Sequence, residues 1–161
     1  MISTEQAKKI ENIVNSAGSI LASAHIGEAE IHRKSGPANF VTDYDVRIQE
    51  YLITELSSVL PTCSFYGEED TNGNEYRVGD GYTFFIDPID GTTNFMFDYR
   101  NSCVSVGLAL DGKMIAGWVF NPFTDQFWKG VKGEGAYLND RKLQMESRAL
   151  EDGICAFGCA R

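Results

Sequence analysis

Two aspartates, Asp87 and Asp90, stand three residues apart in the segment Asp-Pro-Ile-Asp-Gly-Thr-Thr, directly after an apolar run. The intervening proline stiffens the turn, so both carboxylates can approach one point at the end of a predicted strand. Converging carboxylate oxygens are the ligands that hard divalent cations require. Aspartate, proline and glycine are also the commonest turn-forming residues, so this short segment is equally compatible with a structural turn.

The residues that follow, Gly91, Thr92 and Thr93, suit an anion. If they open a helical turn, their exposed backbone amides form a cradle for an anion, and the threonine hydroxyls can hold a water molecule. Cations beside such a cradle would neutralise phosphate oxygens and activate the water as a nucleophile. The pattern therefore indicates attack of water on a phosphomonoester.

A second acidic group, in the segment Gly67-Glu68-Glu69-Asp70, ends another predicted strand. We expect it to lie at the same sheet edge as the aspartate segment. An acidic run by itself is more often a solvated loop, because charged side chains prefer water. Residues 67–81, which contain four glycines, are predicted to form a long flexible loop of the kind that often lies over a site.

Two helices should precede these strands. Ser3 and Gln6 form a capping-box pattern, and apolar residues at three- and four-residue spacing predict a helix that ends before Gly27. Residues 28–33 favour a short strand. Thr42 is the expected N-cap of a second helix that continues to Pro61.

After Pro61 the apolar period changes to two, which predicts a series of strands. Asp111-Gly112 between two apolar runs is a strong hairpin signal. Two helices followed by a mostly antiparallel meander predict an α+β fold with both helices on one face of the sheet. The expected strands are residues 63–66, 82–86, 102–110, 113–120, 126–131 and 136–138.

Composition narrows the possible partners. The chain has 161 residues and a net charge of −9, with no basic run, which disfavours nucleic acid and anionic membranes. No apolar run approaches the ~18 residues needed to cross a bilayer, and no signal peptide is recognisable. We therefore expect a reduced, cytoplasmic protein. The four cysteines lack zinc-site spacing, and the roles of Cys155 and Cys159 stay open.

The Glu68-Glu69 pair, followed by the segment Asp87–Phe95, resembles the first signature of the inositol monophosphatase family of Mg²⁺-dependent, lithium-sensitive phosphatases. The likeness extends through Asn39–Asp45 and Gly133–Ala136 and covers residues 5–157. It implies the N-terminal half of a layered αβαβα fold. Residues 1–148 would form an α+β metal- and phosphate-binding domain, and residues 149–161 would begin a truncated C-terminal α/β domain.

The resemblance also implies a ligand set. Glu68 and Asp87, with the backbone carbonyl of Ile89, would bind one Mg²⁺, and Asp87 would bridge to a second ion that Asp90 also holds. Glu68 and Thr92 would orient the attacking water.

Three further residues receive roles in the same way. The amides of Gly91 and Thr92 would bind the phosphate. Asp45 would lie in the outer shell or near a weaker third metal, although its place in the first turn of a helix is explained equally well by the helix dipole. Lys34 would lie on a mobile loop that closes over the site, although a lysine is more often simply a solvated charge.

One family feature is missing from this sequence. The family's second signature, Trp-Asp followed by small residues, completes the second metal site, but here Trp118 is followed by Val119 and Trp128 by Lys129. We therefore expect one metal site and little or no turnover.

The resemblance implies a small phosphorylated substrate, such as an inositol phosphate or a related sugar or nucleotide phosphate, and a homodimer. The alternatives are a catalytically silent metal-binding or regulatory module and, less favoured, an acidic Ca²⁺-binding loop protein. The latter lacks the spacing of an EF-hand loop.

Overall fold

The computed structural model describes residues 1–25, 31–33, 40–69, 80–144, 146–147, 149 and 151. Four sequence predictions concern residues outside these ranges. They are the loop-closing role of Lys34, the roles of Cys155 and Cys159, the central part of the predicted loop 67–81, and nearly all of the expected C-terminal segment 149–161. Within the described ranges, no helix is long and apolar enough to cross a membrane.

Both predicted helices are present. Helix α1 (Thr4–Ser23) begins with the expected capping box, in which the Gln6 amide donates to Ser3 Oγ at 3.1 Å and the Ser3 amide donates to Gln6 Oε1 at 2.9 Å. Helix α2 (Asp43–Val59) follows the predicted N-cap, Thr42. The backbone N–H of Thr42 donates to Asp45 Oδ2 at 2.7 Å, which fixes the first turn of α2.

A seven-stranded sheet follows the helices, in the order β3-β4-β5-β6-β7-β8-β9. Strands β3 and β4 pair in parallel, and every later pair is antiparallel, as the meander predicts. The hairpin turn has positive φ at Asp111 (49°) and Gly112 (74°), which confirms the Asp-Gly signal. The strands are β3 (Ser64–Gly67), β4 (Tyr82–Asp90), β5 (Cys103–Leu110), β6 (Lys113–Asn121), β7 (Gln126–Val131), β8 (Gly135–Leu138) and β9 (Arg141–Lys142).

Three short elements complete the described structure. Strand β1 (Ile31–Arg33) lies within the predicted 28–33 strand and pairs antiparallel with β2 (Phe40–Thr42), which the sequence analysis did not predict. Strand β9 was also missed. The expected helical turn after the aspartate segment is present as α3 (Thr92–Met96).

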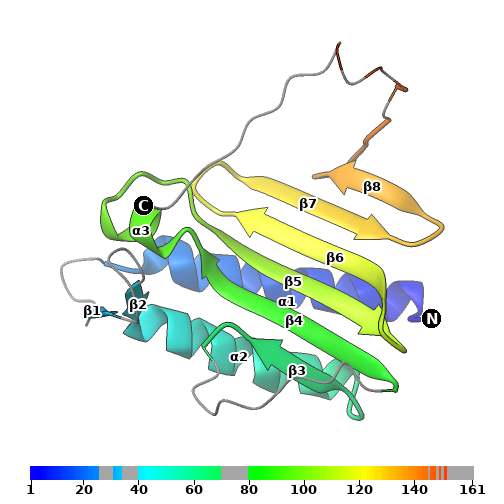
Figure 1. The fold of residues 1–161 in the computed structure, drawn as a ribbon, viewed down its shortest axis with the longest axis horizontal. Helices are drawn as coiled ribbons and strands as arrows, with labels where there is room; N and C mark the ends of the chain where they lie inside the picture. The colour runs from blue at the N-terminus through cyan, green and yellow to red at the C-terminus, as the bar shows by residue number, and fades with distance from the viewer. Residues whose placement is uncertain are drawn as a thin grey trace.

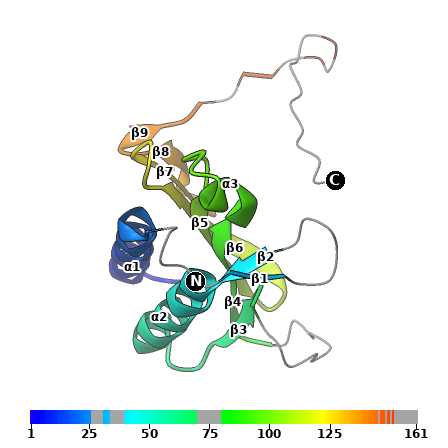
Figure 2. The same ribbon diagram turned by 90° about the vertical axis from the view of Figure 1, so that its left-hand side faces the viewer.

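Helices α1 and α2 both cover the same face of the sheet (Figures 1 and 2), so the predicted α+β fold with its two helices on one side is confirmed. Apolar side chains at helical spacing meet alternating side chains of the central strands, and this contact buries the core. Its fully buried members include Ile10, Val14 and Leu21 of α1, Ile48, Leu52 and Leu56 of α2, and Phe84, Val104, Leu108 and Trp118 of the sheet.

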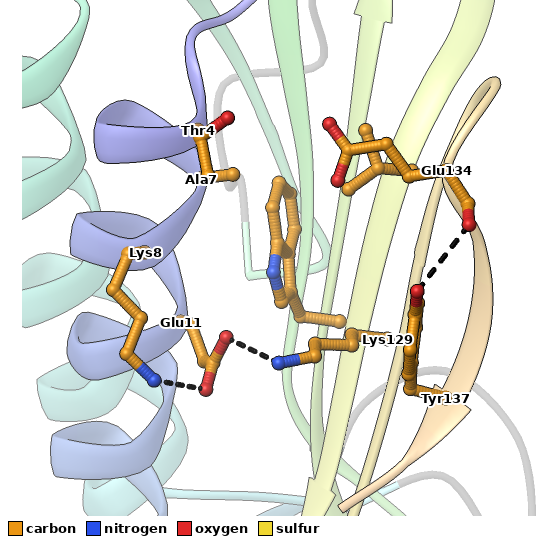
Figure 3. A pocket seen from close by; sticks show the side chains of 9 residues that line it. Thr4, Ala7, Lys8, Glu11, Lys129, Glu134 and Tyr137 are labelled. Atoms are coloured by element: carbon orange, nitrogen blue, oxygen red, sulfur yellow. Dashed lines mark hydrogen bonds and ion pairs between the residues drawn. The ribbon is translucent and has the colours of Figure 1, made fainter. Parts of the chain in front are cut away.

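A polar contact joins α1 to the outer part of the sheet. Glu11 accepts hydrogen bonds from Lys8 at 2.6 Å and from Lys129 of β7 at 2.8 Å, beside a small cavity of about 150 Å³ (Figure 3). Burial raises the pKa of Glu11, but the bonds from the two lysines outweigh it and hold this pKa below its usual value of 4.5. The lysines therefore favour the ionised carboxylate.

Replacing Glu11 with Gln should lower the melting temperature at neutral pH by about 2–4 °C, for a loss of about 1 kcal/mol after solvent screening. Because the folded pKa of Glu11 is lowered, its contribution is present above pH 4.5 and is lost as the pH falls through the folded pKa. In thermal melts from pH 3 to 7, the melting temperature of the variant should fall less steeply towards acid pH than that of the wild-type chain. Glu5→Gln is the matched control, because Glu5 pairs with Lys9 on the exposed surface of the same helix, and it should have no measurable effect.

Candidate active site

The end of the parallel pair β3-β4 brings the two acidic segments together. Gly67, the last residue of β3, pairs with Ile86 of β4, and the backbone N–H of Glu68 donates to the Ile86 carbonyl at 3.0 Å. Since the carboxyl ends of parallel neighbours share one edge, Glu68 lies beside the Asp87–Asp90 segment, as expected from the sequence. This arrangement places the carboxylates of Glu68, Asp90 and Asp45 close enough to influence that of Asp87.

The aspartate segment is not a turn after the strand. The sequence analysis ended this strand at Ile86, but β4 continues through Asp90, with Asp87 opposite Ser105 and Asp90 opposite Cys103 of β5. The pairing register shifts between the two aspartates. Proline has no N–H to contribute to a sheet ladder, and such an irregularity is where a strand accommodates it. The end of β4, rather than a loop, therefore fixes both carboxylates.

Asp87 is the electrostatically unusual member of this cluster. Its Oδ1 is buried and has no hydrogen-bond partner. Burial, followed by the charge and hydrogen bonding of Glu68 and the charges of Asp90 and Asp45, raises the pKa of Asp87 to about 8. A buried acceptor without a partner, surrounded by like charges, is an arrangement that a cation would stabilise.

Asp45 and Thr92 connect α2 to the end of β4. The Thr92 hydroxyl lies 3.2 Å from Asp45 Oδ1 and 3.0 Å from the carbonyl oxygen of Ile89. Asp45 is only 1% exposed, and its Oδ2 accepts from both the backbone N–H and the hydroxyl of Thr42. A role of Asp45 in the first turn of α2 is therefore compatible with a position near the metal site. One of its carboxylate oxygens accepts hydrogen bonds from Thr42 at the start of the helix, and the other lies next to the Thr92 hydroxyl.

Gly91 forms the N-cap of α3 with φ 89° and ψ 42°, the left-handed conformation that glycine adopts without strain. A Cβ at this position would lie 3.0 Å from the Asn101 carbonyl oxygen. The Gly91 carbonyl accepts hydrogen bonds from the Phe95 amide at 3.0 Å and from Ser102 Oγ at 2.9 Å. These two hydrogen bonds therefore fix the position of Gly91, the first residue of the predicted anion cradle.

The donor set fits a hard divalent cation, because it consists of carboxylate and carbonyl oxygens and includes the unpartnered Asp87 Oδ1. No three His, Cys, Asp or Glu side chains among the described residues are arranged to enclose one ion. In the described arrangement, Glu68 instead contributes to raising the pKa of Asp87.

Gln49 of α2 is a site residue that the sequence analysis missed. Its side-chain oxygen accepts a hydrogen bond from the Glu69 amide at 3.0 Å, so it holds the turn that carries Glu68. The carboxamide occupies the space where Gly67 lacks a side chain, since a Cβ there would lie 2.3–2.6 Å from its atoms. Gln49 is 7% exposed and lies three residues before Leu52, so a polar residue on the apolar side of the helix was the available signal.

Comparison with known proteins gives the same family throughout. A model of the inositol monophosphatase family matches residues 2–161. Inositol monophosphatase 1 of Bos taurus is 38% identical over 134 residues, which are 83% of this chain and 48% of that protein. Inositol monophosphatase 2 of Saccharomyces cerevisiae is 40% identical over 117 residues, which are 73% of this chain and 40% of that protein.

Solved structures show the same fold. The extragenic suppressor protein suhB of Bartonella henselae superposes with a TM-score of 0.72 and 28% identity, over 85% of this chain and 53% of that one. A staphylococcal IMPase-I complexed with products gives a TM-score of 0.75 and 25% identity, over 88% and 53% of the two chains. The chain thus spans about half the length of the relatives that it matches.

Proposed function

Because the chain belongs to the inositol monophosphatase family, we propose that residues 1–148 form the metal- and phosphate-binding part of a Mg²⁺-dependent phosphomonoesterase. Residues 149–161 would begin a second domain. The observation that carries the proposal is the buried, unpartnered Asp87 Oδ1 among three other carboxylates at the end of β3 and β4. An oxygen-liganded cation at this place would relieve the electrostatic cost of the buried carboxylate.

Glu68, Asp87 and the Ile89 carbonyl would hold the first Mg²⁺, and Asp87 and Asp90 would share a second one. When bound, the cation neutralises phosphate oxygens and lowers the pKa of a coordinated water. The family's second metal site needs a carboxylate from the Trp-Asp signature, which residues 1–161 do not contain. We therefore propose one strong site and one weak site.

The remaining groups would position the reactants. Thr92, whose hydroxyl already lies 3.0 Å from the Ile89 carbonyl, would orient the attacking water together with Glu68. The amides of Gly91 and Thr92 would donate to phosphate oxygens, aided by the left-handed Gly91, which turns the chain from β4 into α3. Asp45 would act through Thr92 rather than touch the substrate.

The substrate would be a small phosphorylated molecule, an inositol phosphate or a related sugar or nucleotide phosphate. The structure of SaIMPase-II with inositol monophosphate bound supports the first of these classes. A homodimer is also proposed from the family resemblance. Phe97 and Tyr99, which are 67% and 73% exposed next to α3, are apolar side chains that such a contact would cover.

Calorimetric titration of the full chain tests the proposal directly. We expect one strong Mg²⁺ site, and we expect inorganic phosphate to bind at least tenfold more tightly with Mg²⁺ than in EDTA. Asp87→Asn should remove this Mg²⁺ dependence, whereas Asp140→Asn, a change of an exposed aspartate away from β4, should not. An affinity for inorganic phosphate that is the same with Mg²⁺ and in EDTA would refute the proposed site.

Hydrolysis of inositol 1-phosphate separates the phosphatase from its alternative, a catalytically silent metal-binding module. We expect little turnover from residues 1–161 alone, because these residues include no Trp-Asp carboxylate. Any Mg²⁺-dependent release of phosphate that Asp87→Asn abolishes would support the enzyme. Mg²⁺ binding with no release would favour the silent module. Lithium-inhibited hydrolysis at an ordinary enzyme rate would contradict the expected weak turnover.

A further inference from the structure

The chain folds back between β4 and β5 at one end of the sheet, and this connection includes α3 (Figure 1). The pairing register of the two strands shifts between Asp87 and Asp90, and the last pair beyond the shift is Asp90 opposite Cys103. The backbone ladder therefore ends at the residue before Gly91, which begins the proposed phosphate cradle. Groups outside the ladder must hold the peptide groups that follow.

The peptide group that joins Gly91 to Thr92 is held through its carbonyl. The Gly91 carbonyl accepts hydrogen bonds from the Ser102 hydroxyl at 2.9 Å and from the Phe95 amide at 3.0 Å. This peptide group is trans and planar, so its N–H, which belongs to Thr92, points opposite to the carbonyl and away from Ser102. Fixing the Gly91 carbonyl therefore fixes the direction in which the Thr92 N–H can donate.

Ser102 is itself held in place. It is 1% exposed, so little water reaches it to compete for its hydroxyl. Asn94 Nδ2 donates to the Asn101 carbonyl at 2.9 Å, which ties the residue before Ser102 to α3. A Cβ on Gly91 would lie 3.0 Å from the Asn101 carbonyl oxygen and 3.3 Å from Asn94 Nδ2. It would lie 3.4 Å from Ser102 Oγ, so all three groups lie closely around Gly91.

The segment that returns the chain from α3 to Ser102 has an unfavourable backbone. Asp98 and Arg100 have φ values of 51° and 53°, in the left-handed region that residues with a side chain uncommonly adopt. Such conformations persist where the surrounding structure holds them, and they cluster at functional sites. Here they lie on the path that brings Ser102 within hydrogen-bond distance of Gly91, eleven positions earlier. The contact between Ser102 and Gly91 is therefore maintained despite backbone strain.

We infer that Ser102 is a positioning residue for phosphate binding, because its hydroxyl holds the peptide group between Gly91 and Thr92 so that the Thr92 N–H donates to a phosphate oxygen. Ser102 acts through this peptide group and does not touch the phosphate. The inference rests on the proposed function, in which the amides of Gly91 and Thr92 bind the phosphate. The single hydroxyl hydrogen of Ser102 is donated to Gly91 and not to a proposed metal ligand. Ser102 should therefore affect phosphate binding much more than Mg²⁺ binding.

Calorimetric titration of the full chain carrying Ser102→Ala tests the inference. The two probes are Mg²⁺ alone and inorganic phosphate in the presence of Mg²⁺. We expect the affinity for phosphate to fall about fivefold, as for the loss of one hydrogen bond, and the affinity for Mg²⁺ to stay within about twofold of the wild-type value. A general loss of structure at the end of β4 would lower both affinities.

Two further variants complete the test. Asn94→Ala frees the Asn101 carbonyl from α3 and leaves Ser102 intact, so it should also weaken phosphate binding, by about threefold, without weakening Mg²⁺ binding. Ser57→Ala is the matched control, because Ser57 Oγ donates to the Ile53 carbonyl at 2.7 Å within α2. Ser57 lies twelve residues beyond Asp45, about 18 Å along the helix, and its substitution should change neither affinity.

Nuclear magnetic resonance on the ¹⁵N-labelled chain measures the same effect at the Thr92 amide. With Mg²⁺ present, saturating inorganic phosphate should shift the Thr92 amide signal of the wild-type chain. The shift should be smaller in Ser102→Ala, because the peptide group is no longer held in the direction that suits the phosphate oxygen. An equal shift in both chains would contradict the role of Ser102.

The outcomes separate the two claims. A Ser102→Ala variant with unchanged phosphate affinity, or with equal losses of phosphate and Mg²⁺ affinity, would overturn the role of Ser102 and leave the proposed function intact. A wild-type chain that binds Mg²⁺ but no inorganic phosphate would overturn the proposed phosphate cradle and, with it, this inference.

Discussion

Replacing Asp87 with Asn should raise the melting temperature of the metal-free protein at pH 8 by about 2–6 °C and remove the stabilisation that Mg²⁺ gives the wild-type chain. The first effect follows because the substitution removes a buried negative charge that faces Glu68, Asp90 and Asp45. The second follows because the same substitution removes the carboxylate that both proposed metal sites share. One variant should therefore be more stable without Mg²⁺ and less responsive to it.

The pH dependence has a definite sign. The pKa of Asp87 is raised from 3.8 to about 8, so between these values the folded chain holds a proton that the unfolded chain releases. Stability of the metal-free wild type should therefore fall as the pH rises across this range, and the slope should be smaller in Asp87→Asn. Mg²⁺ competes with that proton, so its binding should strengthen as the pH rises through about 8.

Thermal melts in EDTA and in Mg²⁺ from pH 5 to 9 measure both effects. Asp140→Asn is the control, because Asp140 is an exposed aspartate away from β4. It should change neither the metal-free stability nor the Mg²⁺ response. A lower melting temperature for Asp87→Asn in EDTA would show that Asp87 has a structural role.

Gly67→Ala should weaken Mg²⁺ binding about tenfold, although Gly67 contributes no ligand. The new Cβ would lie 2.3–2.6 Å from the carboxamide atoms of Gln49, which must move away. The Glu69 amide then loses its acceptor at 3.0 Å, and the turn that carries Glu68 loses its attachment to α2. The lost hydrogen bond should also cost about 1–3 kcal/mol of stability.

A double-mutant cycle isolates this mechanism. Gln49→Ser makes room for the alanine. The Gln49→Ser substitution should therefore cost much less stability in the Gly67→Ala variant than in the wild-type chain. Gly117→Ala is the matched control, because a Cβ there meets its nearest atom, the Val106 carbonyl oxygen, at 3.8 Å. It should leave Mg²⁺ affinity unchanged. Strictly additive effects of Gly67→Ala and Gln49→Ser would refute the coupling.

Local sequence signals predicted most of the fold, because the interactions that carry them are also local. The Ser3 capping box and the Asp111-Gly112 turn each involve residues within four positions, and both are present. The two-stranded pairing of β1 with β2 and the short β9 were missed, because strands of two or three residues carry too few positions to show a period. The end of β4 was placed too early, at Ile86, because antiparallel pairing with β5 extends β4 past a proline that signals a turn.

The site was only partly predictable for a related reason. The proposed ligand carboxylates lie just after the end of β3 or in the last residues of β4, and strand ends can be identified approximately from sequence, so Glu68, Asp87 and Asp90 could be placed at one edge. The contribution of Gln49 depends on a contact between α2 and the turn after β3 across twenty positions, which no local pattern encodes. The contact of Asp45 with Thr92 spans forty-seven positions and has the same origin.

Paramagnetic broadening by Mn²⁺ tests most directly whether divalent cations bind at Glu68, Asp87, Ile89 and Asp90. Mn²⁺ takes the same oxygen ligands as Mg²⁺ and broadens the resonances of nearby nuclei. At substoichiometric Mn²⁺, the amide signals of these four residues should disappear first, while those of the distant β5-β6 hairpin persist. Broadening centred on other acidic residues, or spread evenly over the surface, would contradict the account.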